Sequence, residues 1–254
     1  MTHPSRLATL LIYASCLLFS SIIQAETLRI AVAANFAETL RSIAKQFEEN
    51  SEHKLVLVVG STGKHYAQIR NGAPFDAFFA ADRRRPEMLD QQGLMVPDSR
   101  FTYAVGRLAL WSPDATQVDP AGEVLKKGSF RHLAIANPKL APYGRAAQQL
   151  LQKHGLWQAL QSRMVRGENI GQAFQFVKSG SAELGLVALS QIQRPGQPIP
   201  GSYWLVPGSL HTPIEQQAVL LRETAASRAF YNFFQSDRAK ATIQGYGYGT
   251  PDAG

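Results

Sequence analysis

Strand-like apolar segments alternate with helix-like amphipathic segments along most of this 254-residue chain, and that alternation predicts an α/β fold. Two of the strand-like segments, 103–111 and 216–221, lie where one strand–helix set gives way to the other. We therefore predict two lobes joined by a hinge that two strands cross. Lobe 1 is expected to comprise residues 26–105 plus 212–254, and lobe 2 residues 106–211.

The first set of elements begins after residue 26. Apolar residues recur at helical spacing in 36–50, as in a helix that packs on a sheet. The segment 54–59 is almost continuously apolar, which is typical of a strand covered on both faces. In order, the set comprises strand 28–33, helix 36–50, strand 54–59, a short helix after Gly63, strand 76–80, a helix capped by Asp82, and the long strand 103–111.

The second set has the same alternation. Gly155 is expected to end a helix, because glycine readily takes the left-handed conformation found there. The Pro- and Gly-rich piece 194–201 is predicted to be a loop. In order, the set comprises strand 132–136, helix 143–154, helix 169–178, strands 184–188 and 203–206, the returning strand 216–221, and terminal helices in 224–244.

Residues 1–25 have the layout of a cleaved secretory signal peptide: Arg6, an apolar run over 7–23, and a small-residue exit at Ala25. A membrane anchor is the first alternative, although the run is short for the roughly 20 apolar residues that a spanning helix needs. A lipoprotein signal at Cys16 is the second, although the apolar run continues past it. Export to the periplasm is predicted, and the mature chain would hold no cysteine and hence no disulfide.

The net charge is +7, and loss of Arg6 with the signal leaves +6. Lysines and arginines are scattered, and the one tight run, 83–85, is expected on a solvated helix surface. We therefore expect no nucleic-acid partner. A mild positive field does suit attraction of a small anion.

Catalytic motifs are missing from the sequence. The segment 60–64 resembles a phosphate-binding loop, but that motif needs glycine at Val58 and Ser or Thr at His65. There is no Gly-x-Ser-x-Gly elbow, and the six histidines have no metal-type spacing. Serine chemistry at Ser61 with a distant histidine stays open, because such partners meet only in space. The chain is predicted not to be an enzyme.

Small or hydrogen-bonding residues stand at several strand-to-helix joints. In open α/β sheets, ligands bind beyond the carboxyl ends of the strands, where free N–H groups at helix starts attract anions. Each such residue is also an ordinary cap or packing residue when taken alone, so their co-occurrence carries the prediction. The joints are 34–35, 61–62, 142–144 and 168–170.

With these features the chain resembles the periplasmic molybdate-binding proteins of ABC importers. The resemblance covers essentially the whole mature chain and is carried by five stretches: 29–36, 60–63, 71–82, 137–145 and 183–188. It implies a type II periplasmic-binding-protein fold that closes over a tetrahedral dianion. Residue by residue, it implies contacts from Ala34, Asn35 and Ser61 in lobe 1, and from Tyr143 and the Ile170 N–H in lobe 2.

The sequence departs from many members of this family at one position. They carry a tyrosine on the strand where this chain has Ala188, and an alanine where it has Tyr143. Another branch of the family has its tyrosine at the helix start, as here. The departure leaves the donors of lobe 2 less defined than those of lobe 1.

The ligand that the resemblance implies is molybdate, with tungstate also accepted because the two are nearly the same size. A fully deprotonated anion needs only donors, which backbone N–H groups, a serine hydroxyl, an amide and a phenol supply. No cofactor and no direct metal ligand are expected, since molybdenum is bound as its oxyanion. A monomer that docks with a membrane-embedded ABC permease is expected. Sulfate, thiosulfate or another small oxyanion, and an exported enzyme, are the alternatives.

Overall fold

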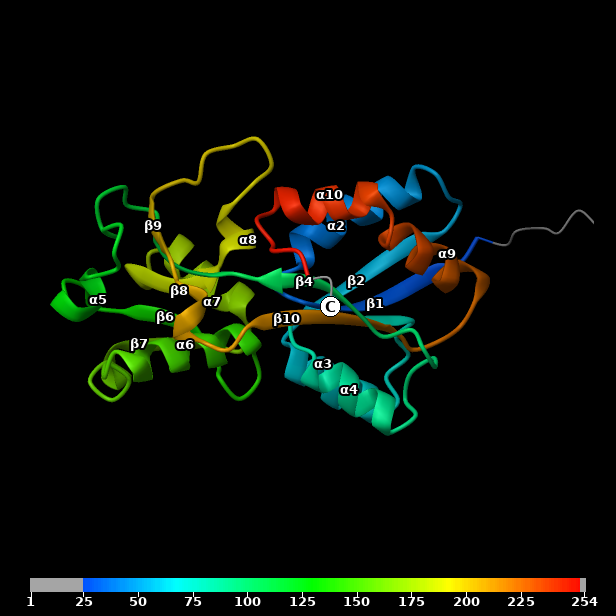
Figure 1. Cartoon of the computed structure of the whole chain (residues 1–254), viewed down its shortest axis with the longest axis horizontal. Coiled ribbons are helices and arrows are strands. Elements are labelled where there is room, and N and C mark those ends of the chain that lie inside the picture. The colour runs from blue at the N-terminus through cyan, green and yellow to red at the C-terminus, as the bar shows by residue number, and fades with distance from the viewer. Residues whose placement is uncertain (1–24, 252–254) are drawn as a thin grey trace, which may run out of the picture.

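The computed structural model describes residues 25–251, so the predicted signal peptide lies, apart from Ala25, outside the described residues. Two five-stranded sheets lie side by side, each flanked by helices (Figure 1). The first has the strand order β2-β1-β3-β10-β4 and the second β7-β6-β8-β5-β9. The predicted α/β fold with two lobes is confirmed.

The strands are β1 Thr27–Ala33, β2 Lys54–Gly60, β3 Ala77–Ala80, β4 Phe101–Gly106, β5 Leu108–Ser112, β6 Leu133–Ala136, β7 Met164–Gly167, β8 Leu184–Ala188, β9 Ser202–Leu205 and β10 Ile214–Leu220. The α-helices are α2 Ala37–Glu48, α3 Thr62–Arg70, α4 Arg84–Gln91, α5 Val124–Lys127, α6 Pro142–Lys153, α7 Ile170–Lys178, α8 Leu189–Ile192, α9 Ala225–Phe234 and α10 Asp237–Gly245. Two 3₁₀ turns, Gln161–Arg163 and Gly208–Leu210, complete the set.

Three strands of each sheet run parallel and end at the same edge. In the first sheet β1 pairs in parallel with β2 and β3, and in the second β6 pairs in parallel with β7 and β8. The two remaining strands of each sheet lie beyond β3 or β8 and pair antiparallel. The loops after the parallel strands are therefore gathered at one edge of each sheet, which is where an α/β sheet binds its ligand.

The chain crosses between the sheets twice, as predicted. The predicted long strand 103–111 is in fact two strands, because β4 pairs with β10 up to Gly106 while β5 pairs with β8 from Leu108. Arg107 separates them. The second crossing is the segment 206–213 between β9 and β10.

Each sheet has its own buried core. In the first, Phe36, Phe79, Tyr103 and Phe234 form an aromatic cluster with ring centroids 4.6–6.0 Å apart, which packs α2 and α9 against the sheet. In the second, the apolar faces of α6 and α7 cover β6 and β8. The loops that follow the strands are thus held by two separate cores, one in each lobe.

The helix ends agree with the predicted signals. Asp82 Oδ1 accepts the Arg85 N–H at 3.1 Å, and Gly155 has a φ of 69° just after α6. The structure adds β7 and the four-residue helices α5 and α8, which were not predicted. Within residues 25–251, no helix has the length and apolar character needed to cross a bilayer.

Candidate functional site

A small cavity lies between the two sheets. Its empty space, about 180 Å³ with its open mouth included, is smaller than that of four other hollows on the described surface, which hold about 810 Å³ or more. A space of this size suits a small ion rather than an organic metabolite. Its lining residues come from both sheets: Ala33, Ala34, Asn35, Gly60, Ser61, Thr62, Ala81, Ala141, Pro142, Tyr143, Asn169 and Ile170.

All five residues predicted from the sequence lie in this lining. Ala34 and Asn35 follow β1, Ser61 follows β2, Tyr143 is in the first turn of α6, and Ile170 begins α7. They meet because each stands just beyond the carboxyl end of a parallel strand or at the start of the helix that follows it. The position after a strand end therefore explains both why the sequence indicated these residues and why they lie together.

Backbone N–H groups are the main donors of the cavity. The N–H groups of Asn35, Ser61, Tyr143 and Ile170 have no protein acceptor among residues 25–251. For Ser61, Tyr143 and Ile170 this follows from position, since the first N–H groups of a helix have no partner within it, whereas Asn35 lies in the turn between β1 and α2. The positive ends of the helix dipoles add to the attraction for an anion.

Charged side chains are missing from the lining. Every lining residue in the described part of the chain is neutral, and no carboxylate faces the space. Two acids adjoin lining residues in the sequence: Asp82, which is bound by Arg85 and Arg145, and Glu168, which is bound by Lys64. A cavity with donors and no ionised acceptor favours a fully deprotonated anion, because a protonated one would need an acceptor for its own hydrogen.

Two hydroxyl side chains supplement the N–H groups. Ser61 is 2% exposed, and its Oγ accepts the Lys64 N–H at 3.3 Å, so its own hydrogen is free to be donated. Thr62 is 1% exposed, and its Oγ1 accepts the Ala81 N–H at 3.0 Å. Thr62 was predicted only as part of a helix start and is a further candidate donor.

Asn35 lies at the cavity with its amide already engaged. Its Nδ2 donates to Gln216 Oε1 at 2.8 Å and to Tyr248 Oη at 3.1 Å, which uses both amide hydrogens. Its Oδ1 is buried and has no partner within the described residues. The structure thus points to the Asn35 backbone N–H, and not to the predicted amide NH₂, as the donor that faces the ligand.

Tyr143 is 1% exposed, and its hydroxyl sits at the hinge. Its Oη accepts from Gln216 Nε2 at 3.4 Å. Burial raises the pKa of Tyr143 well above its usual value, so the hydroxyl keeps its hydrogen at any physiological pH. Gly106 makes room for it, because a Cβ at that position would overlap Tyr143 Oη.

Backbone contacts alone were predicted for Ala34 and Ile170, and the two backbone N–H groups differ in the structure. The Ala34 N–H donates to Gly60 O at 2.9 Å, so it is not available to a ligand. The Ile170 N–H is free, as the first of α7. Ala188 is fully buried at the end of β8 and is not part of the lining, so position 188 supplies no donor in this chain.

Direct contacts join the two lobes around the cavity. The Gly63 N–H donates to Leu140 O at 2.9 Å, and Ser190 Oγ donates to Asn35 O at 3.0 Å. Lys64 and Glu168 form an ion pair of 3.3 Å. The structure is therefore that of the closed form.

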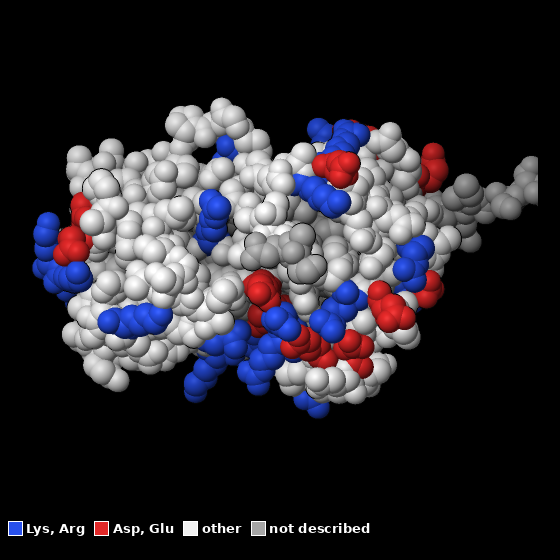
Figure 2. All heavy atoms as spheres, in the orientation of Figure 1, with Lys and Arg blue, Asp and Glu red and all other residues white. Residues whose placement is uncertain are grey.

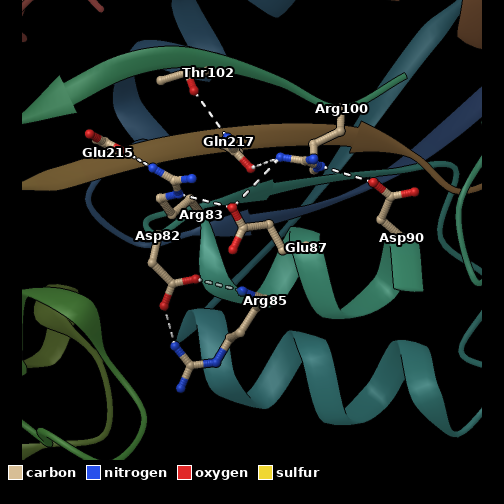
Figure 3. A network of polar contacts seen from close by, with 9 residues as sticks. All are labelled: Asp82, Arg83, Arg85, Glu87, Asp90, Arg100, Thr102, Glu215 and Gln217. Carbon is tan, nitrogen blue, oxygen red and sulfur yellow. Dashed lines mark hydrogen bonds and ion pairs between the residues drawn. The ribbon is translucent and has the colours of Figure 1, made fainter. Parts of the chain in front are cut away.

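A chain of ion pairs borders the cleft on one side. Figure 2 shows basic and acidic side chains interleaved where the lobes meet, and Figure 3 shows part of the network on α4 and β10. Asp82 binds Arg85 of its own lobe and, at 3.2 Å, Arg145 of lobe 2. Arg85, half-buried, is turned into this network and is the one member of the run 83–85 that departs from the predicted solvated surface.

Among residues 25–251, no group of three or more His, Cys, Asp or Glu side chains is placed to hold a metal ion. His65 lies beside the site but is buried, with Nε2 3.2 Å from Val32 O and Nδ1 3.0 Å from Gln68 Oε1. Both ring nitrogens are thus engaged away from Ser61.

Three residues behind the cavity were not predicted: Gln216, Tyr248 and Ser190. Tyr248 Oη donates to Asn35 O at 2.8 Å, and Gln216 joins Asn35 to Tyr103 and Tyr143. They stand 155 to 213 residues away from Asn35 along the chain. No local pattern of the sequence could have indicated them.

Comparison with known proteins places the chain among exported binding proteins. Residues 28–249 match the family model described as bacterial extracellular solute-binding protein. The molybdate-binding protein ModA of Azotobacter vinelandii is 50% identical over 229 residues, covering 89% of this chain and 91% of that protein. That of Rhodobacter capsulatus is 45% identical over 224 residues, covering 87% of each.

A solved structure agrees in fold. The periplasmic molybdate-binding protein of Azotobacter vinelandii superposes with a TM-score of 0.86 at 44% identity, covering 88% of this chain and 99% of that one. Together with the two-sheet architecture and the cavity between the sheets, the match over 28–249 leads to one conclusion: this chain belongs to the family of bacterial extracellular solute-binding proteins.

Proposed function

We propose that the protein captures molybdate, and equally tungstate, in the cavity between its lobes and delivers it to an ABC permease. The relatives named as molybdate-binding proteins, at 50% and 45% identity, support the choice of ligand. Export through a cleaved signal peptide places this step in the periplasm. The lobes that close on the anion are 26–105 plus 212–254 and 106–211.

The observation that supports this proposal is a small cavity lined by uncharged residues, among them residues of both lobes whose backbone N–H groups have no protein acceptor within residues 25–251. Ala34, Asn35, Ser61, Tyr143 and Ile170 are the proposed contact residues. The backbone N–H groups of the last four and the Ser61 hydroxyl are the proposed donors. Sulfate has the same charge and shape as molybdate, so discrimination between them must rest on the size of the closed cavity.

No cofactor and no catalytic step are part of this proposal, and the protein acts as a monomer. A tetrahedral dianion is held by hydrogen bonds alone and is released unchanged. A turnover assay with ester and phosphoester substrates is expected to give no activity above buffer.

A thermal-shift screen of anions tests the function. Molybdate and tungstate are each expected to raise the melting temperature, since a ligand at about 1,000-fold excess over its Kd stabilises by roughly 4 kcal/mol. Sulfate and thiosulfate at the same concentration should shift it little. Equal shifts with sulfate and molybdate would show that the cavity does not select by size.

A further inference from the structure

Gln216 is fully buried behind the cavity, at the start of β10, and it contacts both lobes. Its Oε1 accepts from Asn35 Nδ2 at 2.8 Å and from Tyr103 Oη at 3.0 Å. Its Nε2 donates to Tyr143 Oη at 3.4 Å. A buried amide with donors at one end and a hydroxyl at the other is held in one orientation.

The orientation of Gln216 decides where the Tyr143 hydrogen goes. A tyrosine hydroxyl has a single hydrogen and can donate only once. Because Gln216 donates to Tyr143 Oη, that hydrogen is not used on Gln216. No other acceptor within residues 25–251 takes it, and Tyr143 lines the cavity. The hydrogen is therefore left for a bound anion.

We propose that Gln216 is a positioning residue of the anion site, which keeps the Tyr143 hydroxyl hydrogen available to the ligand by donating to its oxygen. The inference rests on the proposed function, because it needs an anion in the cavity. It adds a residue of lobe 1 that controls a donor of lobe 2, so the donor is in place only when the lobes are closed.

The opposite arrangement makes a different prediction. If Gln216 turned over alone, its NH₂ would face the NH₂ of Asn35, which is repulsive. If both amides turned over together, the buried Asn35 Oδ1 would gain a partner, but Tyr143 would then donate to Gln216. In that arrangement the hydroxyl hydrogen is lost to the ligand, and Tyr143→Phe would bind like the wild type.

The first test is a double-mutant cycle on the full mature chain, with affinity for molybdate measured by titration calorimetry. Tyr143→Phe is expected to weaken binding by about 10- to 150-fold, the range for a hydrogen bond to a charged group. Gln216→Met keeps the length of the side chain and removes its hydrogen bonds, so it should weaken binding about tenfold or more. In the Tyr143→Phe background the same change should cost about threefold or less.

Gln217→Met is the matched control. Gln217 is the next residue of the same strand, is 6% exposed, and donates to Thr102 Oγ1 at 3.1 Å (Figure 3). Neither residue lines the cavity. Gln217→Met should lower the melting temperature without changing the affinity for molybdate. Equal factors for Gln216→Met in both backgrounds, or wild-type affinity in Tyr143→Phe, would overturn the proposal.

The second test is a pH profile of Gln216→Glu, which keeps the proposal testable if Gln216→Met does not fold. An ionised carboxylate accepts the Tyr143 hydrogen and repels the anion, whereas a protonated one can donate to Tyr143 as glutamine does. Burial raises the pKa of this carboxyl. Affinity of the variant should therefore rise as pH falls from about 8 to about 6.

The wild type should be flat over the same range. The titratable groups around residue 216 are Tyr103, Tyr143 and Tyr248, and burial raises the pKa of each above its usual value of 10. Two charged groups near them are also paired: Asp82, whose charge acts on Tyr103, with Arg85 and Arg145, and Glu215, the preceding residue, with Arg83. A pH-independent affinity in Gln216→Glu would contradict the proposal. If the wild type fails to bind molybdate, the proposed function fails first, and the cycle is run with the oxyanion that the thermal-shift screen selects.

Discussion

Ser61 illustrates how one residue serves both the fold and the site. As the N-cap of α3 its Oγ accepts from the Lys64 N–H, while its backbone N–H and its hydroxyl hydrogen remain for a ligand. The capping role explains why serine stands there in terms of helix formation alone. The co-location with Asn35, Tyr143 and Ile170 adds the binding role.

Ser61→Ala is therefore expected to weaken molybdate binding by about 10- to 150-fold while the protein stays folded. Ser99→Ala is the control, because Ser99 is equally buried and hydrogen-bonded but lies away from the cavity. Titration calorimetry on both variants measures the difference. Wild-type affinity in Ser61→Ala would remove its hydroxyl from the site.

Gly106 is needed for the close approach of Tyr143 and not for a special backbone angle. A Cβ at Gly106 would overlap the Tyr143 hydroxyl and lie 2.8 Å from Gln216 Nε2. Gly106→Ala should displace both groups and destabilise the closed form by about 1–3 kcal/mol, as overpacking of a buried site does. Weaker molybdate binding is expected, with Gly208→Ala unchanged, since Gly208 has open space around it. Equal affinities in the two variants would argue against this role.

His65 gives stability a pH dependence. Burial lowers the pKa of His65 from its usual 6.5, against hydrogen bonds to Gln68 and Val32 that raise it. Above pH 6.5 the ring is neutral in both folded and unfolded chains, and its full contribution is present. As pH falls below 6.5 the unfolded chain binds the proton first, so stability falls until the folded pKa is passed.

Urea unfolding of wild type and His65→Gln between about pH 7 and pH 5 checks this. The wild type should lose stability over that range more steeply than the variant, whatever their absolute stabilities. Parallel profiles would show that His65 does not titrate as its burial implies.

At the scale of elements, the sequence predicted most helices and strands, and with them the site loops. It failed where partner choice, rather than local pattern, sets the boundary. Apolar residues flank Arg107 on both sides, so nothing in 103–111 reveals that the strand leaves one sheet for the other there. The helices α5 and α8 span four residues each, too few for a helical period to be recognised.

The same reason limits the prediction of the site. The five predicted residues follow strand ends that local patterns reveal, whereas Gln216 and Tyr248 reach Asn35 only through the folded topology. Which atom of Asn35 faces the ligand depends on these distant partners. The residues that line the cavity were predictable, and the atom with which Asn35 faces it was not.

The ion pair between Arg145 of α6 and Asp82, just before α4, links the two lobes. Asp82 is 9% exposed in its side chain, and Arg145 of lobe 2 is 40% exposed. Arg145→Gln should weaken molybdate binding by about 1.4- to 5-fold, mainly through faster release, because surface pairs contribute about 0.2–1 kcal/mol. High salt should shrink the difference.

Arg131→Gln is the matched control, because Arg131 pairs with Glu183 at 2.7 Å within lobe 2 alone. Its release rate for molybdate, measured by stopped-flow competition, should equal that of the wild type. A similar acceleration in both variants would show that the effect comes from net charge and not from the link between lobes.

For the whole molecule, the contacts between lobes and the two short crossings indicate a hinge motion. The lobes share hydrogen bonds at Gly63–Leu140 and Ser190–Asn35, and the chain between the sheets is one residue at Arg107 and a short segment at 206–213. Such crossings can absorb a rotation while the sheets stay rigid. Without an anion, the unpaired N–H groups of both lobes gain by opening to water.

Small-angle scattering should therefore show a smaller radius of gyration with molybdate than without it. Gly106→Ala should reduce the change, because it obstructs the closed form. An identical radius with and without saturating molybdate in the wild type would show that the lobes do not open.

The donors around the cavity belong largely to the peptide backbone, and this shapes how the site responds to mutation. A side-chain substitution cannot delete an N–H group unless it introduces proline, so most changes at Ile170 leave the donor in place. Positions that set the spacing of the helix starts are the vulnerable ones. Gly144 is an example, since a Cβ there would overlap Ala136 O. Saturation mutagenesis scored by molybdate uptake should thus find its most intolerant positions among packed glycines, with the polar residues of the lining second.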